Sequence, residues 1–394
     1  MVILTGLIAL CAMALALPLL SDLVSLAACL GRVRAPRPVS PFVPRFLVLI
    51  PAHNEELLIA DCLMSLRNLS YRRDAVDIRV IADNCSDRTA DLARGHGVRC
   101  FERSEPALAG KPHAIAWALE RLSLKDFDAV VILDADTIVD PGFLTALASA
   151  APLSHKAVQG FNGVSNPDDN ALTRMAAVFA DAKCGFAYEL KRHAGLNLPL
   201  RLGGCIGTGV LATHGWKAFS IGEDWELYAM LTAAGVSIEG VPEARVYAQE
   251  ARALRQSAPQ RRRWAAGRLT VLARCIGPLL RSGAINSHQK LDTIGELSAP
   301  GPVVHLGLAL LLAGLAVALH LPASDWLVAL LFAGIARHVC YTLAAMTRQP
   351  RPFRSALAFA VLPLYGLWRL GVEVGALAML GDRPWIRTER HGHA

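Results

Sequence analysis

An almost uninterrupted apolar segment opens the chain, from about Val2 to Leu30, and only Pro18 and Asp22 break it. About 20 apolar residues in a helix suffice to cross the roughly 30 Å hydrocarbon core of a bilayer. A cleaved signal peptide is the alternative interpretation. The run is too long for one, lacks a basic start and shows no small-x-small cleavage site before the prolines that follow. We therefore predict a transmembrane helix over residues 1–31.

Basic residues follow this segment, and nothing basic except the amino terminus precedes it. Because cytoplasmic flanks of membrane helices are enriched in Lys and Arg, the asymmetry predicts that the next region is cytosolic, in a bacterial inner membrane. Prolines interleaved with these residues predict a stiff tether over residues 32–45. The basic residues are Arg32, Arg34, Arg37 and Arg45, and the prolines are Pro36, Pro38, Pro41 and Pro44.

The composition agrees with a chain that is partly embedded in lipid. Of the 394 residues, 53% are hydrophobic and 19% are charged, which is more apolar than a soluble enzyme needs. The net charge of +7 suits basic loops at a lipid surface or an anionic substrate. No nucleic-acid-binding motif accompanies the basic residues, so nucleic acid is not an expected partner. The nine cysteines include no C-x-x-C pair, which fits a reduced catalytic domain.

The carboxyl-terminal region, residues 297–381, is apolar again and predicts two to three further spans. Two of them, Pro302–Leu321 and Trp326–Met346, are long and nearly free of charge. A basic tail over residues 382–394 ends the sequence.

A third apolar stretch, Ser355–Leu380, contains polar residues that interrupt it. If it crossed the membrane, the basic tail would lie on the outer side. A kinked, interfacial or re-entrant element is therefore an equal alternative. Residues 269–296 mix basic side chains with leucines and predict an amphipathic helix in the membrane interface, with an ordinary surface helix as the alternative. The interrupting residues of the third stretch are Pro363, Arg369 and Glu373.

Between these apolar regions, residues 46–268 alternate short apolar runs with helical patterns. Such βαβ alternation predicts an α/β domain with a mostly parallel sheet, right-handed crossovers and a ligand site at the carboxyl ends of the strands. The expected strands are Phe46–Ile50, Ile78–Ala82, Val98–Phe101 and Ala129–Leu133, and the expected helices are Leu57–Leu69, Thr89–Arg94 and Lys111–Leu122.

Polar residues follow the first two expected strands. Ala52, Asn54 and Glu55 come after the first strand and suit a nucleotide-facing loop, or alternatively a helix cap. Asp83 ends the second strand, where its carboxylate can accept a hydrogen bond from a base or a ribose. Further along this loop, Asp87 is expected to cap the next helix.

Two carboxylates one residue apart, Asp134 and Asp136, follow the fourth expected strand. Mg²⁺ and Mn²⁺ prefer oxygen ligands and, in nucleotide sites, bridge one or two carboxylates to diphosphate oxygens. Lys111 follows Gly110 at the start of a helix, where phosphate oxygens are stabilised. The sequence therefore predicts a site for Mg²⁺ or Mn²⁺ and a nucleotide at this edge of the sheet.

Two later motifs complete a resemblance to a known family. Gly222–Trp225 resembles the acidic catalytic-base motif of glycosyltransferase family 2, and Gln260–Trp264 matches the Q-x-x-R-W signature of its membrane-bound branch. That branch includes cellulose, chitin and hyaluronan synthases. The resemblance implies a GT-A type, Rossmann-like nucleotide-sugar-binding domain joined to transmembrane helices.

The resemblance also implies a reaction. Asp224 would be the catalytic base of an inverting transfer from a nucleotide-diphosphate sugar, expected to be a UDP-sugar that carries a hexose or N-acetylhexosamine, while the metal stabilises the departing diphosphate. A salt-bridged surface aspartate is the alternative for Asp224, and a basic interfacial patch is the alternative for Gln260–Trp264.

The further roles that the resemblance implies concern the donor and the acceptor. Ala52, Asn54, Glu55 and Asp83 would hold the nucleoside, and the nucleotide would lie near Lys111 and Asp134. Arg263 would contact the diphosphate and Trp264 would line the path of the acceptor sugar. Gln260 would also belong to the donor-binding residues. Gly203–Gly209 stands where relatives carry a Gly-rich loop on the acceptor side, or makes only a turn.

The remaining interpretations of the function differ in the acceptor of the sugar. The Q-x-x-R-W signature favours a growing glycan, as in exopolysaccharide or oligosaccharide synthesis. Transfer of a single sugar to a lipid or polyprenyl phosphate is the alternative, because three or four spans leave little room for a translocation channel. A sugar-phosphate nucleotidyltransferase would share the sheet, but it would need an early Gly-rich phosphate loop that the sequence lacks.

Overall fold

The computed structural model describes residues 2–30, 42–321 and 324–379. Most of the predicted tether over residues 32–45, and all of the basic tail over 382–394, lie outside the described residues. The described residues form two compact units. We call them the sheet unit, with residues 42–166 and 197–251, and the helical unit, with residues 2–30, 167–196 and 252–379.

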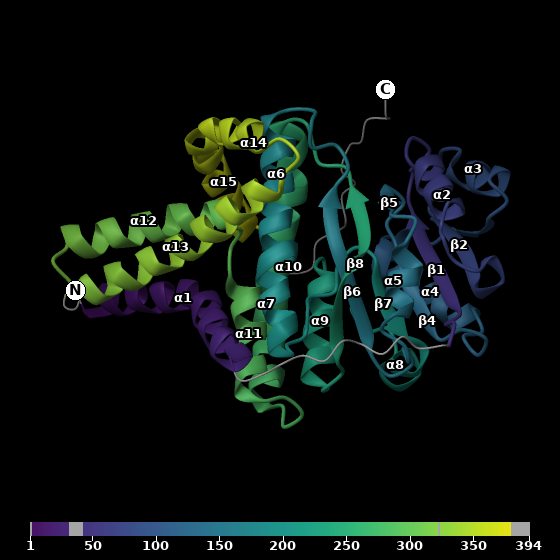
Figure 1. Cartoon of the computed structure of the whole chain (residues 1–394), viewed down its shortest axis with the longest axis horizontal. Coiled ribbons are helices and arrows are strands. Elements are labelled where there is room, and N and C mark those ends of the chain that lie inside the picture. Colours follow the sequence, from purple (N-terminus) through teal and green to yellow (C-terminus); the bar gives the residue numbers. More distant parts are fainter. Residues whose placement is uncertain (1, 31–41, 322–323, 380–394) are drawn as a thin grey trace. The chain divides into compact units, whose positions relative to one another are not determined.

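Eight strands form one sheet in the sheet unit, in the order β3-β2-β1-β4-β7-β6-β8-β5 (Figure 1). The first four expected strands are present and pair in parallel. The other half is mixed, because β7 runs antiparallel to β4 and β6, and β5 runs antiparallel to β8. The bounds are β1 Phe46–Ala52, β2 Val76–Asp83, β3 Arg99–Arg103, β4 Ala129–Ile132, β5 Thr137–Val139, β6 Ala157–Val164, β7 Gly204–Gly207 and β8 Ile238–Ala248.

Strand β1 is buried on both faces, as its continuous apolar run predicts. Phe46, Val48 and Ile50 pack in one core cluster, whereas Leu47 and Leu49 belong to a second cluster. Successive side chains of a strand point to opposite faces, so β1 separates two cores. Helix α2 contributes to the first core and α4 to the second. The helices of this unit are α2 Ile59–Arg67, α3 Thr89–Gly95, α4 Lys111–Arg121, α5 Phe143–Ala148, α8 Thr208–His214 and α9 Glu223–Ala233.

The three expected helices of the first half correspond to α2, α3 and α4. Arg88 and not the predicted Asp87 occupies the capping position of α3, but the Asp87 carboxylate accepts a hydrogen bond from the Thr89 N–H at 3.0 Å and so satisfies an N–H at the start of the helix. The Gly-rich stretch Gly203–Gly209 forms β7 and the start of α8 instead of a loop. A Cβ on Gly207 would lie 2.1 Å from the Leu153 carbonyl oxygen, so this backbone approach requires glycine.

Helices make up the helical unit, and three segments among its described residues are long and apolar enough to cross a membrane: Ile3–Leu30, Ser324–Arg348 and Pro352–Leu377. The predicted N-terminal span and the predicted span Trp326–Met346 are thus confirmed as candidates, and the third apolar stretch also qualifies. The predicted span Pro302–Leu321 does not qualify by itself. Helix α12 has 17 residues and qualifies only together with α11, as a pair bent by 89°. The bounds are α1 Val2–Leu30, α6 Ala171–Ala182, α7 Tyr188–Ala194, α10 Leu254–Arg281, α11 Ser287–Ser298, α12 Pro302–Ala318, α13 Ser324–Arg348, α14 Pro352–Ala358 and α15 Leu362–Leu377.

Residues 269–296 fall on two helices, the end of α10 and most of α11, where the sequence predicted one. Asn286 caps α11 by accepting a hydrogen bond from the Gln289 N–H at 2.8 Å. Helix α10 extends back to Leu254 and includes Gln260–Trp264. The location of this segment in a membrane interface stays a prediction.

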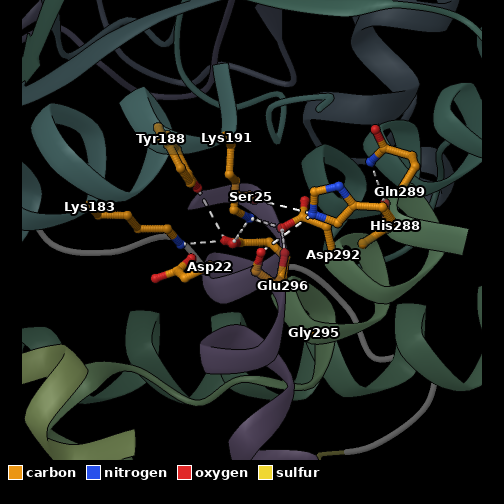
Figure 2. Close-up of polar contacts among 12 residues, drawn as sticks. Asp22, Ser25, Lys183, Tyr188, Lys191, His288, Gln289, Asp292, Gly295 and Glu296 are labelled. Carbon is orange, nitrogen blue, oxygen red and sulfur yellow. Dashed lines mark hydrogen bonds and ion pairs between the residues drawn. The ribbon is translucent and has the colours of Figure 1, made fainter. Parts of the chain in front are cut away.

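Polar contacts tie α1 to α11 and α13. The Ser21 hydroxyl donates to Asp292 Oδ1 at 2.8 Å, and Arg337 Nε lies 2.6 Å from Asp22 Oδ2. Figure 2 shows Ser25 beside His288, whose Nε2 is 3.2 Å from the Ser25 hydroxyl. The polar residues near the end of the apolar helix α1 therefore have protein partners, as buried polar groups require.

Candidate active site

Three carboxylates surround one lysine at the sheet edge predicted from the sequence. Lys111 Nζ lies 3.0 Å from Asp134 Oδ1, 3.2 Å from Glu223 Oε1 and 3.5 Å from Asp224 Oδ1. These residues are far apart in the sequence, and all belong to the sheet unit. The fold therefore joins the acidic motif after β4 to the acidic motif at the start of α9.

The first turns of two helices hold the lysine and two of the carboxylates of this cluster. Helix α4 begins at Lys111, directly after Gly110, whose φ of +119° is readily adopted only by glycine. Helix α9 begins at Glu223, so Glu223 and Asp224 occupy its first turn, where the helix dipole stabilises negative charge. Asp134 lies in the turn between β4 and β5, at the carboxyl end of a buried strand.

The cluster changes the acid–base properties of its members. Burial among protein atoms raises the pKa of Asp224 to about 7; the nearby Lys111 ammonium opposes this rise, and Glu223 adds to it. Burial alone would lower the pKa of Lys111, but its carboxylate neighbours outweigh that effect and hold the pKa well above its usual value. The Asp224 side chain keeps 40% of its surface exposed. It is therefore accessible and able to accept a proton near neutral pH.

Asp83 lies at the same sheet edge, but its carboxylate is already bonded within the protein. It is 2% exposed. Arg103 Nη1 donates to Oδ1 at 2.5 Å, and the Gly110 N–H donates to Oδ2 at 3.0 Å. Asp83 thus fixes the residue that precedes Lys111. Direct contact between Asp83 and a nucleoside stays a prediction.

Arg103 is a buried partner that the sequence analysis missed. Its guanidinium also donates to the Leu108 carbonyl oxygen at 2.9 Å and to Glu105 Oε2 at 3.0 Å, which ties down the loop before α4. The expected strand Val98–Phe101 stopped two residues short of Arg103, and only the observed parallel register of β2 and β3 sets Arg103 opposite Asp83. Arg103 therefore helps to set the position of the Lys111 helix.

The residues predicted to bind the nucleoside, at and after the end of β1, contact the loop after β2. Ala52 is the last residue of β1. Asn54 has a φ of +55°, and its Oδ1 accepts a hydrogen bond from the Ser86 N–H at 2.8 Å. The Glu55 N–H donates to Thr89 Oγ1 at 2.8 Å. These contacts hold the two loops together at the sheet edge.

Asp134 and Asp136 fit a divalent ion that is shared with a diphosphate. Among the described residues, no group of three or more His, Cys, Asp and Glu side chains has metal-binding spacing. Mg²⁺ in nucleotide sites takes one or two carboxylates, several waters and phosphate oxygens. The Asp134 side chain is 43% exposed, so its carboxylate is accessible to an ion that also binds the substrate. Carboxylates of this number and accessibility suit such an ion.

Gln260, Arg263 and Trp264 lie on α10 of the helical unit. The Trp264 side chain is exposed, and the Arg261 guanidinium lies 6.0 Å from its ring centroid. The Arg261 Nε donates to the Ser257 hydroxyl at 2.6 Å. Participation of these residues in the site around Lys111 stays a prediction.

Two curated relatives of this chain carry the names of glycosyltransferases. The probable glycosyltransferase YdaM of Bacillus subtilis (strain 168) is 27% identical over 252 residues, which cover 61% of this chain and 59% of that protein. The chain therefore spans about three fifths of the length of this relative. An N-acetylglucosaminyltransferase of Mesorhizobium japonicum is 27% identical over 370 residues, which cover 87% of this chain and 81% of that protein.

A solved structure and a family model agree with these relatives. The mannosyltransferase PcManGT from Pyrobaculum calidifontis, solved in complex with GDP-Man and Mn²⁺, has a TM-score of 0.57 and 22% identity, and the match covers 95% of this chain and 97% of that one. This likeness supports a GT-A-like fold. The model described as glycosyltransferase like family 2 matches residues 44–267. Because this match covers more than half of the chain, the protein belongs to glycosyltransferase family 2.

Proposed function

We propose that the protein is an inverting, metal-dependent transferase that moves a hexose or N-acetylhexosamine from a UDP-sugar to a growing glycan. One observation carries this proposal: Lys111 joins Asp134 to Glu223 and Asp224 within 3.5 Å, in a family 2 domain. The Mesorhizobium relative named N-acetylglucosaminyltransferase supports an N-acetylhexosamine donor. The Q-x-x-R-W signature at Gln260–Trp264 supports the synthase-like branch and a glycan acceptor.

In the proposed reaction, Asp224 takes the proton of the acceptor hydroxyl as its oxygen attacks the anomeric carbon. The new C–O bond forms as the bond to the nucleoside diphosphate breaks, so the configuration inverts in one step. Lys111 holds Asp224 beside the donor and keeps a positive charge close to the departing phosphates. Arg263 contacts the diphosphate, and the face of the acceptor sugar stacks on Trp264.

The proposed metal site comprises Asp134 and Asp136. When bound there, Mg²⁺ or Mn²⁺ supplies Lewis-acid stabilisation of the charge on the leaving diphosphate. The nucleoside lies against Ala52, Asn54, Glu55 and Asp83, the residues at the ends of β1 and β2.

We further propose that the protein is a multi-pass protein of the bacterial inner membrane with a cytosolic catalytic domain over residues 46–268. Three candidate spans among the described residues support membrane insertion. The basic residues after the first apolar segment support the cytosolic side, because nucleotide sugars are made there.

A second candidate function is the transfer of one sugar to a lipid or polyprenyl phosphate. The small number of candidate spans favours it, since the described residues contain three, or four if the bent pair of α11 and α12 counts as one. A lipid acceptor needs no channel for a long product.

The purified full chain, incubated with bacterial lipid extract, Mn²⁺ and radiolabelled UDP-glucose, UDP-N-acetylglucosamine, UDP-galactose or GDP-mannose, tests the two functions. Butanol extraction separates labelled lipid from polymer. Label from a UDP-sugar in polymer supports the first function, and one labelled sugar on lipid supports the second. Use of GDP-mannose alone contradicts the UDP donor. Equal, metal-independent donor turnover by the wild type and Asp136→Ala contradicts the proposed metal-dependent reaction.

The pH dependence of kcat/KM gives a prediction for the base. We expect kcat/KM to fall below about pH 7, because Asp224 must be deprotonated and its pKa is about 7. Lys111 lowers that pKa, so Lys111→Met should move the acid limb to higher pH as well as weaken donor binding. Initial rates between pH 5 and 9 measure the shift. The matched control is Lys125→Met, at an exposed lysine outside the cluster. If the acid limb of kcat/KM does not move in Lys111→Met, Asp224 is not the titrating base.

A further inference from the structure

Two arginines of the helical unit have donor groups without a hydrogen-bond partner in the described part of the chain. Arg369 lies on α15 and is 8% exposed, and Arg268 lies on α10. Arg369 Nη2 donates to Glu373 Oε1 at 2.9 Å. Arg369 Nη1 and Arg268 Nε are buried and have no hydrogen-bond partner among the described residues. Buried guanidinium N–H groups normally donate to a hydrogen-bond acceptor, so these two atoms indicate that a ligand supplies the missing acceptors.

Close packing of the two helices brings these side chains together. Ala265 and Ala266 of α10 form a buried cluster with Ala376 of α15. A Cβ on Gly375 would lie 3.1 Å from the Nε of Arg262, so small residues at this contact admit a third guanidinium. The contact between α10 and α15 therefore gathers basic side chains from both helices.

Carboxylates do not balance this charge. Arg268 interacts electrostatically with Glu373, Glu296 and Arg369. Glu373 is already bonded to Arg369. Figure 2 shows that Glu296 lies between two lysines, and its oxygens are 2.8 Å from Lys183 Nζ and 2.7 Å from Lys191 Nζ. Asp292 Oδ1 also lies 3.0 Å from Lys191 Nζ, so these two lysines have two carboxylates. Arg268 and Arg369 share only Glu373, and the positive charge in excess is costly to bury unless an anion accompanies it.

We propose that Arg268 and Arg369 bind a phosphate group at the contact between α10 and α15, and that this phosphate belongs to an anionic membrane lipid. A phosphate offers several acceptor oxygens, and the planar guanidinium matches it with paired N–H donors. Arg369 belongs to the candidate span Pro352–Leu377. Ionisable residues in such spans mark functional sites, and basic pockets between membrane helices bind lipid head groups. The proposed function gives Arg268 and Arg369 no role, so a lipid ligand at these residues goes beyond it.

Native mass spectrometry of the full chain, released from micelles with equal phosphatidylglycerol and phosphatidylcholine, tests the proposal. We expect phosphatidylglycerol to be retained preferentially. Arg268→Met and Arg369→Met should each lower its retention by about tenfold, the effect of losing one hydrogen bond between charged groups. Arg281→Met removes an arginine from the exposed end of the same helix and should change nothing.

Glu373→Gln separates a ligand site from a structural role. Removing the competing carboxylate should strengthen phosphatidylglycerol retention, whereas loss of a purely structural ion pair would only destabilise the protein. Size-exclusion profiles show which variants fold, and Arg369→Lys, which keeps the charge, should retain part of the binding.

A third measurement identifies the source of the phosphate. Inorganic phosphate at 10 mM should not displace the lipid. Displacement, with Arg369-dependent binding of phosphate alone, would overturn the lipid assignment. Equal retention of the two lipids by the wild type, or lipid retention unchanged in folded Arg268→Met and Arg369→Met, would overturn the site. Sugar transfer assayed in parallel keeps these outcomes separate from any failure of the proposed reaction.

Discussion

Replacing Asp224 with asparagine should lower kcat for sugar transfer by about 10²–10⁴-fold, the usual contribution of a general base. Asparagine has nearly the same shape but cannot take the acceptor proton. Donor affinity should change by only a few-fold, because Lys111 keeps its contacts with Asp134 and Glu223. Initial rates with labelled donor give kcat, and titration calorimetry with UDP gives the affinity.

The matched control is Asp126→Asn, at an exposed aspartate in the loop before β4. It should transfer sugar at the wild-type rate. Residual transfer above one tenth of wild type in Asp224→Asn, with intact donor binding, would assign the base to another residue.

Alanine at Asp136 should lower transfer by about 10²–10³-fold at low Mn²⁺, because a metal ion contributes several kcal/mol to charge stabilisation at the leaving group. High Mn²⁺ should restore part of the rate if Asp134 still binds the ion. Rates measured over a Mn²⁺ titration show the change in apparent metal affinity.

Asp134→Ala should differ from Asp136→Ala in one respect. Asp134 contributes to the raised pKa of Asp224, so its removal should move the acid limb of kcat/KM to lower pH. Asp126→Ala again serves as the control for loss of a carboxylate. Equal Mn²⁺ dependence in the wild type and Asp136→Ala would argue against a metal at this pair.

Local sequence patterns were sufficient for the first half of the sheet unit. Continuous apolar runs and helical periodicity predicted β1 to β4 and α2 to α4, since buried parallel strands such as Phe46–Ala52 have an unmistakable pattern. The same logic placed Asp83, Lys111 and Asp134 at one edge. The family resemblance at Gly222–Trp225 led to Asp224, which the fold brings to Lys111.

The second half of the sheet unit depends on pairing with strands that are distant in the sequence. Strand β7 is only four residues long and glycine-rich, so nothing local distinguishes it from a loop; its pairing with β4 and β6 makes it a strand. Arg103 escaped notice for the same reason, because its importance comes from Asp83 on the neighbouring strand. The segment 269–296 is divided between two helices because Asn286 caps the start of α11, and the spacing of the leucines does not reveal this cap.

The Asp22–Arg337 pair has a consequence for the order in which the protein is made. The two residues are 315 positions apart, and Ser21 and Asp292 are 271 apart. A chain grows from its amino terminus at about 5–20 residues per second, so α1 is synthesised many seconds before its partners exist. During that interval the Asp22 carboxylate lacks its arginine. Completion of the helical unit must therefore await the last helices, whereas the sheet unit has all its strands once Ala248 has been added.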